Sequence, residues 1–354
     1  MKKRSGLIGT AVLVILGLVA FAFRNRIQFD WGMFWRQLRY IHAVHLLAAI
    51  ALIYATYWLR SVRWAVMLKP IKKIGWSRTC GSQFIGFTAV ALFGRLADLT
   101  RPYLIARRVE LSLGSQVAVY TIERMFDLGA AAVIFSGALA FTPRDLPHHE
   151  IFVRTGVVSL AGTLFLALFA LGIRAGGVGV AHLVRALLGR LSQPLAEGFA
   201  GKIIEFREGL MTLTSFAQMA LTLAISLAIW GIIGMAYVET LHAFVATPEL
   251  ATISFSRTML LMAASIGGSL LQLPIIGWFT QIAVTATAMR TFYGAPVEAA
   301  TACGALLLVV TWISIIPIGL LFAQIERVNL KAAATESEAA ANQMEHEAAR
   351  AAEG

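Results

Sequence analysis

Charge is scarce in this sequence. Only 14% of its 354 residues are Asp, Glu, Lys or Arg, against roughly 25% in an ordinary soluble domain. Apolar residues make up 58% of the chain, and the mean hydropathy is +0.74. This balance excludes a soluble multidomain protein and indicates that much of the apolar surface faces lipid.

Cysteine and metal-ligand patterns are also nearly absent. The two cysteines, Cys80 and Cys303, are too few for a disulfide framework or a Cys-rich metal site. The seven histidines lie outside or at the ends of the apolar runs, and none has metal-ligand spacing to a Cys or a carboxylate. A phosphate-binding Gly-x-x-x-x-Gly-Lys-Ser/Thr loop is missing too. The sequence therefore predicts no metal, no cofactor and no direct use of ATP.

Acidic residues are outnumbered, with 19 Asp and Glu against 30 Lys and Arg and a formal net charge of +11. In an apolar chain this surplus is expected to mark the cytoplasmic membrane face, and we predict no nucleic-acid partner. Lys2, Lys3 and Arg4 precede the first apolar run, and the stretch 60–78 carries basic residues and no acid. Both termini are therefore predicted in the cytoplasm, at the inner cell membrane. The loop 24–39 is an exception, because its arginines outnumber Asp30.

Apolar runs long enough to cross a bilayer predict an all-α, polytopic membrane bundle of about six spanning helices. The first run could instead be a signal peptide, since Ala20-Phe21-Ala22 resembles a cleavage site. Its length favours a retained helix. The connection 174–215 is amphipathic and is expected to lie on the inner leaflet or dock a partner. The six runs are 5–23, 43–59, 115–142, 151–173, 216–244 and 299–323.

Two further apolar stretches are too short or too broken to cross. Residues 79–93 span about 22 Å as a helix and run into charges. Residues 258–273 break at Pro274 and Gly277 and resume to 292. We predict re-entrant hairpins at about 79–108 and 258–292, entering from opposite sides. Such opposed broken helices are typical of an inverted transporter repeat with the site between them, although no sequence repeat accompanies the hydropathy pattern.

The tip of the first hairpin offers groups that suit an anion. Pro102 favours a helix beginning at Arg101 or Pro102, so that its N-terminus points inward. Arg95 and Arg101, with only Asp98 between them, leave net positive charge that matches a phosphate-containing headgroup. The alternative is that Arg95, Asp98 and Arg101 form an ion network that only holds the hairpin in place.

A second group of charges lies inside the expected span 115–142. Glu123 and Asp127 share one helix face, and Arg124 is three residues from Asp127. Their expected partners are the surplus arginines of the preceding hairpin. This group either holds the hairpin or carries protons that couple transport to a gradient.

These motifs carry a family resemblance. Gly94-Arg95-x-x-Asp98, Arg101-Pro102-Tyr103-Leu104 and Glu123-Arg124-x-x-Asp127 together resemble the membrane region of lysylphosphatidylglycerol synthases, a flippase-like family with stand-alone members. The resemblance extends to about residue 325. Pro274-x-x-Gly277 is similar to the family's later Pro-Gly break. Family members frequently carry Glu near the position of Gln281, so a carboxylate role is not available there.

The resemblance implies translocation of lipids between leaflets. The expected substrate is an anionic phospholipid or a polyprenyl-linked lipid, supplied by a separate lipid-synthesising enzyme. We expect one membrane domain over 1–325 and an Ala/Glu-rich cytoplasmic tail over 326–354 that is a solvated helix or disordered. Because no soluble aminoacyl-transferase domain follows, we do not predict an enzyme. The alternatives are an integral enzyme that modifies a headgroup, with Glu123 or Asp127 as base, and a non-catalytic subunit of a lipid-pathway complex.

Overall fold

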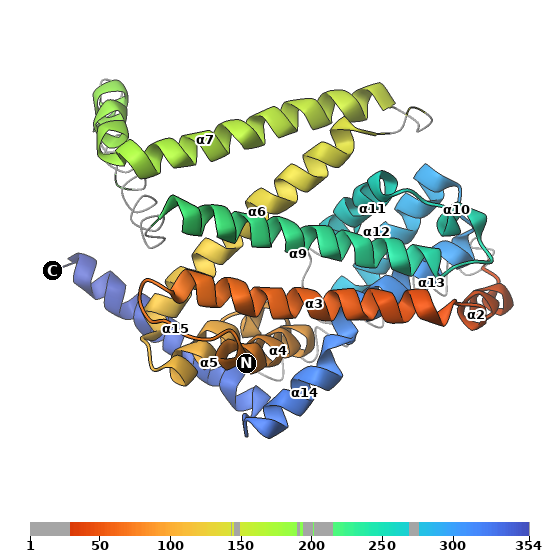
Figure 1. The fold of residues 1–354 in the computed structure, drawn as a ribbon, viewed down its shortest axis with the longest axis horizontal. Helices are drawn as coiled ribbons and strands as arrows, with labels where there is room; N and C mark the ends of the chain where they lie inside the picture. The colour runs from red at the N-terminus through yellow and green to blue at the C-terminus, as the bar shows by residue number, and fades with distance from the viewer. Residues whose placement is uncertain are drawn as a thin grey trace.

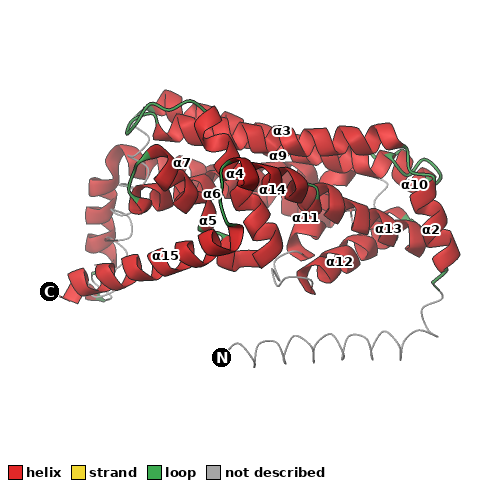
Figure 2. Cartoon of the chain, turned by 90° about the horizontal axis from the view of Figure 1, so that it is seen from below, coloured by secondary structure: helices red, strands yellow, loops and turns green. Residues whose placement is uncertain are grey.

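The structure is a computed structural model that describes residues 29–142, 149–189, 215–268 and 276–353, with the single positions 144, 192, 193 and 201. Every regular element in these ranges is a helix (Figure 2). The predicted all-α class is thus confirmed. The first expected run, 5–23, lies outside the described residues.

Helical elements follow one another along the described ranges. Their bounds are α2 Trp31–Arg39, α3 Ala43–Leu68, α4 Ser77–Phe93, the 3-10 turn η1 Gly94–Ala97, α5 Thr100–Val109, α6 Leu113–Ala140, α7 His149–Leu188, α9 Phe216–His242, α10 Pro248–Ala251, α11 Phe255–Gly268, α12 Ile276–Tyr293, α13 Val297–Leu308, the π-turn η2 Val309–Ile313, α14 Ile315–Ile325 and α15 Leu330–Glu353.

Four helical segments among the described residues are long and apolar enough to cross a membrane: Ala43–Leu68, His149–Gly176, Phe216–His242 and Val297–Ile325. Each overlaps an expected run. Helix α6 has 28 residues, which is also sufficient length, but it contains the charged residues Glu123, Arg124 and Asp127.

Helices α3 and α9 lie side by side through the middle of the molecule (Figure 1). Helices α4, α5, α14 and α15 lie on one side of this pair, and α6 and α7 lie on the other. The pair α11 and α12 packs with α13 near one end of the molecule, and α6 packs against both α9 and α11. The largest apolar core includes Leu241, Met262 and Leu307 from these helices.

The first predicted hairpin region is a helix, a break and a second helix. Helix α4 ends because Gly94 takes a φ of 72°, a left-handed conformation that glycine adopts without a Cβ clash. Arg95 lies in the 3-10 turn that follows. Helix α5 begins at Thr100, so Pro102 is its third residue rather than its first. That position is still tolerated, since its backbone N–H would have no partner within the helix.

A close crossing holds α4 against α5. A Cβ added to Gly86 would lie 2.6 Å from the Cβ and 2.9 Å from the Cα of Arg101. Only glycine therefore allows the backbone of α5 to approach α4 this closely at Arg101.

The second predicted hairpin region contains two described helices, α11 and α12. Helices α11 and α12 pack against each other, and Gly277 is buried in the first turn of α12. The connecting residues 269–275, which include Pro274, lie outside the described part of the chain.

The last long apolar segment, Val297–Ile325, is locally underwound at the π-turn η2, just before Pro317. Proline removes a backbone donor, and a π-turn is one way a membrane helix accommodates the break. The Tyr54 hydroxyl donates to the Ser314 carbonyl at 2.6 Å, and the Thr88 hydroxyl donates to the Ile315 carbonyl at 3.2 Å. Polar groups from α3 and α4 thus satisfy the interrupted backbone.

Two expectations about the ends of elements need revision. Helix α7 turns at Gly176, and the expected amphipathic connection 174–215 is described continuously only to residue 189. The tail is helical, but its first turns are packed rather than solvated, with Ala333 and Ser337 buried against η1 and α5. The Ser337 hydroxyl lies 3.3 Å from the Thr100 hydroxyl.

The close crossing at Gly86 yields a prediction. Gly86→Ala should destabilise the protein by about 1–3 kcal/mol, because the new methyl group overlaps the Arg101 backbone. Thermal unfolding in detergent measures this. The control Gly137→Ala, in α6, places a methyl where nothing lies within 4 Å, and it should not lower the melting temperature. Equal melting of both variants would contradict the predicted crowding.

Candidate functional site

Six ionisable side chains gather where α3, α5 and α6 meet. We call them the arginine–carboxylate cluster. They are Arg60 and Arg63 of α3, Arg101 of α5, and Glu123, Arg124 and Asp127 of α6. Because three separate segments contribute, the cluster exists only in the folded chain.

Glu123 is the most enclosed member, with none of its surface exposed. Both terminal nitrogens of Arg101 contact the Glu123 carboxylate: Nη2 lies 2.7 Å from Oε2, and Nη1 lies 3.0 Å from Oε1. Arg63 also donates to Oε1 through Nη2. Two guanidinium groups from different helices therefore share one carboxylate.

Asp127 lies one helical turn further along α6 and is 5% exposed. Its Oδ1 accepts a hydrogen bond from Arg63 at 2.6 Å, and its Oδ2 accepts one from Arg60 at 3.1 Å. Arg124, three residues earlier, lies 3.4 Å from the same Oδ2. Arg63 thus bridges both carboxylates and fixes α3 against α6.

Neutral side chains extend the network to two more helices. The Gln83 Oε1 atom of α4 accepts a hydrogen bond from Arg101 at 3.1 Å. The Ser226 hydroxyl oxygen of α9 accepts one from Arg63 at 2.6 Å. Five helices are therefore tied to a single buried polar centre.

Aromatic rings surround the Arg101 guanidinium. Its central carbon lies 4.9 Å from the Trp64 ring centroid, 4.8 Å from Phe87 and 5.1 Å from Tyr120. Such contacts stabilise a cation that has left water. They also keep the planar group in a defined orientation.

The cluster has more positive than negative charge. Four arginines against two carboxylates give +4 − 2 = +2, and Asp98 nearby lowers this to +1. Asp98 lines a small cavity with Arg101, Tyr120 and Arg124, next to Gly86 and Phe87 of α4. The cavity has a volume of about 20 Å³, room for one water molecule.

Several N–H groups of the network have no acceptor among the described residues. They are the Nε atoms of Arg63 and Arg124 and the Nε2 atom of Gln83, all buried. Buried donors are normally hydrogen-bonded. An anion or a water molecule would supply the missing acceptors.

The structure brings together some of the predicted site residues and separates others. Arg101 pairs with Glu123, so an arginine of α5 contacts the charged group of α6. Gly94 and Pro102 shape the break and the start of α5. Arg95 lies in η1, but its side chain is outside what the structure describes, and Asp98 lines the cavity.

One sequence interpretation is wrong. Arg60 and Arg63 were assigned to a loop after residue 59, but α3 continues to Leu68 and buries both. Their three-residue spacing places them on one helix face, and the apolar residues Trp64 to Leu68 that follow could have signalled the longer helix.

The residues at the second break belong to a different polar contact. The Gln281 Nε2 group donates to the Ser265 hydroxyl at 3.1 Å, and the Tyr237 hydroxyl donates to the same oxygen at 3.1 Å. These residues join α12, α11 and α9, away from α4 and α5. No group of three His, Cys, Asp or Glu side chains suited to a metal occurs in the described ranges.

The cluster predicts a large stability effect at Glu123. Glu123→Gln should destabilise the protein by about 3–5 kcal/mol, because Arg63 and Arg101 then lose their shared buried counter-charge. Thermal unfolding in detergent is the measurement. Glu249→Gln, at an exposed position of the short helix α10, is the control and should melt like the parent. If both variants melt alike, Glu123 does not hold the helices together.

Comparison with known proteins agrees with the architecture. The family model described as the lysylphosphatidylglycerol synthase TM region matches residues 7–319. The chain is also 30% identical over 221 residues to Glycosyltransferase AglD of Haloferax volcanii, covering 52% of this chain and 34% of the relative. It thus spans about a third of that relative's length. This chain belongs to the lysylphosphatidylglycerol synthase transmembrane-region family and is a multi-pass membrane protein with a lipid-related role.

Proposed function

We propose that the chain moves an anionic, phosphate-containing lipid between the leaflets of the membrane. The observation that supports this most directly is the arginine–carboxylate cluster, with its surplus positive charge and its buried donors that have no acceptor in the described part of the chain. Charged groups within membrane proteins are costly and are usually retained for function. Guanidinium groups match phosphate oxygens in geometry and charge.

Arg101 is the proposed headgroup ligand. Arg101 lies in the first turn of α5, which follows the break at Gly94. A movement of this short helix would therefore move the Arg101 side chain with it. In this structure the Arg101 guanidinium forms an ion pair with the Glu123 carboxylate. We propose that the lipid phosphate replaces Glu123 at Arg101, with Asp98 and Arg124 at the edge of the same cavity.

Entry of a headgroup requires the cavity to widen, because it now has room for one water molecule. The α4–α5 hairpin is the proposed moving part. Gly94 offers a backbone position that can change conformation at low cost, and the hydrogen bond from Arg101 to the uncharged Gln83 amide costs less to exchange than an ion pair.

Glu123 and Asp127 are proposed to act as counter-charges rather than as proton carriers. Each faces at least two guanidinium groups, so protonating either one would leave buried arginines without compensation. We further propose an inner-membrane location with both termini in the cytoplasm. A separate enzyme would synthesise the lipid.

Lipid translocation is the test. The purified protein in liposomes should move fluorescently labelled phosphatidylglycerol between leaflets, measured by dithionite quenching. Arg101→Ala should slow this at least tenfold, because it removes the proposed phosphate ligand. Arg101→Lys should recover part of the rate, since it keeps the charge and loses the fork. Arg290→Ala, at an exposed position of α12, is the matched control.

Normal translocation by folded Arg101→Ala would overturn the headgroup assignment. Mass spectrometry of the lipid after the assay tests the alternative that the chain is an enzyme. This alternative is tested because the relative from Haloferax volcanii is named a glycosyltransferase. A changed headgroup mass would favour lipid modification. An unchanged mass together with translocation would favour transport alone.

A further inference from the structure

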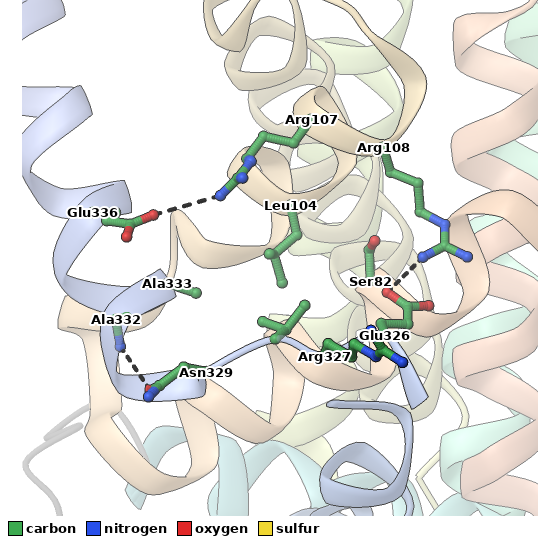
Figure 3. A pocket seen from close by; sticks show the side chains of 11 residues that line it. Ser82, Leu104, Arg107, Arg108, Glu326, Arg327, Asn329, Ala332, Ala333 and Glu336 are labelled. Carbon is green, nitrogen blue, oxygen red and sulfur yellow. Dashed lines mark hydrogen bonds and ion pairs between the residues drawn. The ribbon is translucent and has the colours of Figure 1, made fainter. Parts of the chain in front are cut away.

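A second, larger cavity lies outside the arginine–carboxylate cluster. It has a volume of about 370 Å³ and is enclosed by α5, the connection between α14 and α15, and the first turns of α15 (Figure 3). Leu104, Val328 and Ala333 form apolar parts of its wall. Arg107, Arg108 and Arg327 supply its positive charge.

Of the three arginines of this cavity, only Arg108 forms a short ion pair within the described part of the chain. Arg107 lies 3.6 Å from Glu336, beyond hydrogen-bond distance, and both side chains are more than half exposed. Arg108 pairs with Glu326 at 2.7 Å. Among the described residues, no carboxylate lies within ion-pair distance of Arg327. Three arginines against two carboxylates leave +3 − 2 = +1 at the cavity.

Arg327 also occupies an unfavourable backbone position. It follows α14 with a φ of 53°, a left-handed conformation that is usually taken by glycine at a helix C-terminus. The Val328 N–H donates to the Ala323 carbonyl at 2.8 Å, and the Arg327 N–H donates to the Gln324 carbonyl at 3.1 Å. This geometry is a Schellman cap in which an arginine stands where glycine would be more stable.

The position of the cavity along the chain indicates its depth. Glu326 and Arg327 directly follow Val297–Ile325, an apolar segment of membrane-spanning length. The end of such a segment lies near the level of lipid headgroups. The cavity therefore presents guanidinium groups beside apolar wall residues at the depth where lipid phosphates occur.

We propose that this cavity binds a phosphate group, carried by a membrane lipid or free in solution. A phosphate has enough oxygens to accept from three guanidinium groups, whereas a carboxylate offers two. The site uses Arg107, Arg108 and Arg327 and none of the cluster residues. It therefore does not depend on the proposed translocation, and binding measurements test it separately.

Calorimetric titration of the full-length protein in detergent tests the proposal with two probes. One is inorganic phosphate, and the other is dihexanoyl phosphatidic acid, with dihexanoylglycerol as the phosphate-free comparison. Tighter binding of phosphatidic acid than of phosphate assigns the site to a lipid. Equal binding assigns it to free phosphate. Failure of both probes to bind overturns the proposal.

Arg327→Gly locates the site. It should weaken phosphate binding by about ten- to hundredfold, through loss of a charged donor. It should also leave the melting temperature unchanged or higher, because glycine suits the left-handed position. Glu110→Gly is the matched control: Glu110 has a φ of 54° at the end of α5 and does not line the cavity. The control should bind phosphate like the parent.

Glu326→Gln should change affinity in the opposite direction. It preserves the shape of a side chain that packs against Gly81 and releases Arg108 from its carboxylate. Phosphate should then bind more tightly than to the parent. Parental affinity in Arg327→Gly would overturn the assignment, and so would weaker binding in Glu326→Gln.

Discussion

The burial of Glu123 and Asp127 among arginines is the constraint on which the rest of the structure depends. Neither a carboxylate nor a guanidinium can be buried alone without a cost of several kcal/mol. Arg63 of α3 forms ion pairs with both carboxylates, and Arg101 of α5 forms an ion pair with Glu123. Helices α3, α5 and α6 are therefore fixed relative to one another by charge as well as by apolar packing. Ser226 and Gln83 then bring α9 and α4 into the same arrangement.

Helix α5 connects this buried centre to the surface. It has only ten residues, too few for a stable isolated helix, so its position is set by tertiary contacts. Arg101 joins it to α6, Gly86 allows α4 to lie against it, and the Tyr103 hydroxyl donates to Glu336 of α15 at 2.7 Å. A displacement of α5 would disturb the cluster and the packing of α15 together.

Hydropathy and turn chemistry were sufficient to predict the helical class, most of the long apolar segments and an interruption of the helix between residues 93 and 100. The pairing of Arg101 with the charges of α6 also followed from the sequence, because a buried charge needs a partner. The burial of Arg60 and Arg63 was not predicted, because a basic residue after an apolar run can mark a membrane boundary or take part in a buried ion pair. Only tertiary contacts decide between them. The packing of α15 was missed for a similar reason, because Ala333 and Ser337 are small and their sequence surroundings are polar and Ala-rich.

The surplus of buried arginine has a consequence for any anion that reaches the cluster. Two carboxylates already compensate part of the positive charge. An anion beside the cluster would compensate more of it and would accept from the buried N–H donors that have no acceptor among the described residues. If Glu123 and Asp127 compensated the arginines fully, little would be gained by binding a phosphate. If one of them were absent, the packing of α3, α5 and α6 would be destabilised. The incomplete balance means that the same arginines can support the fold and also favour the anionic headgroup that we propose.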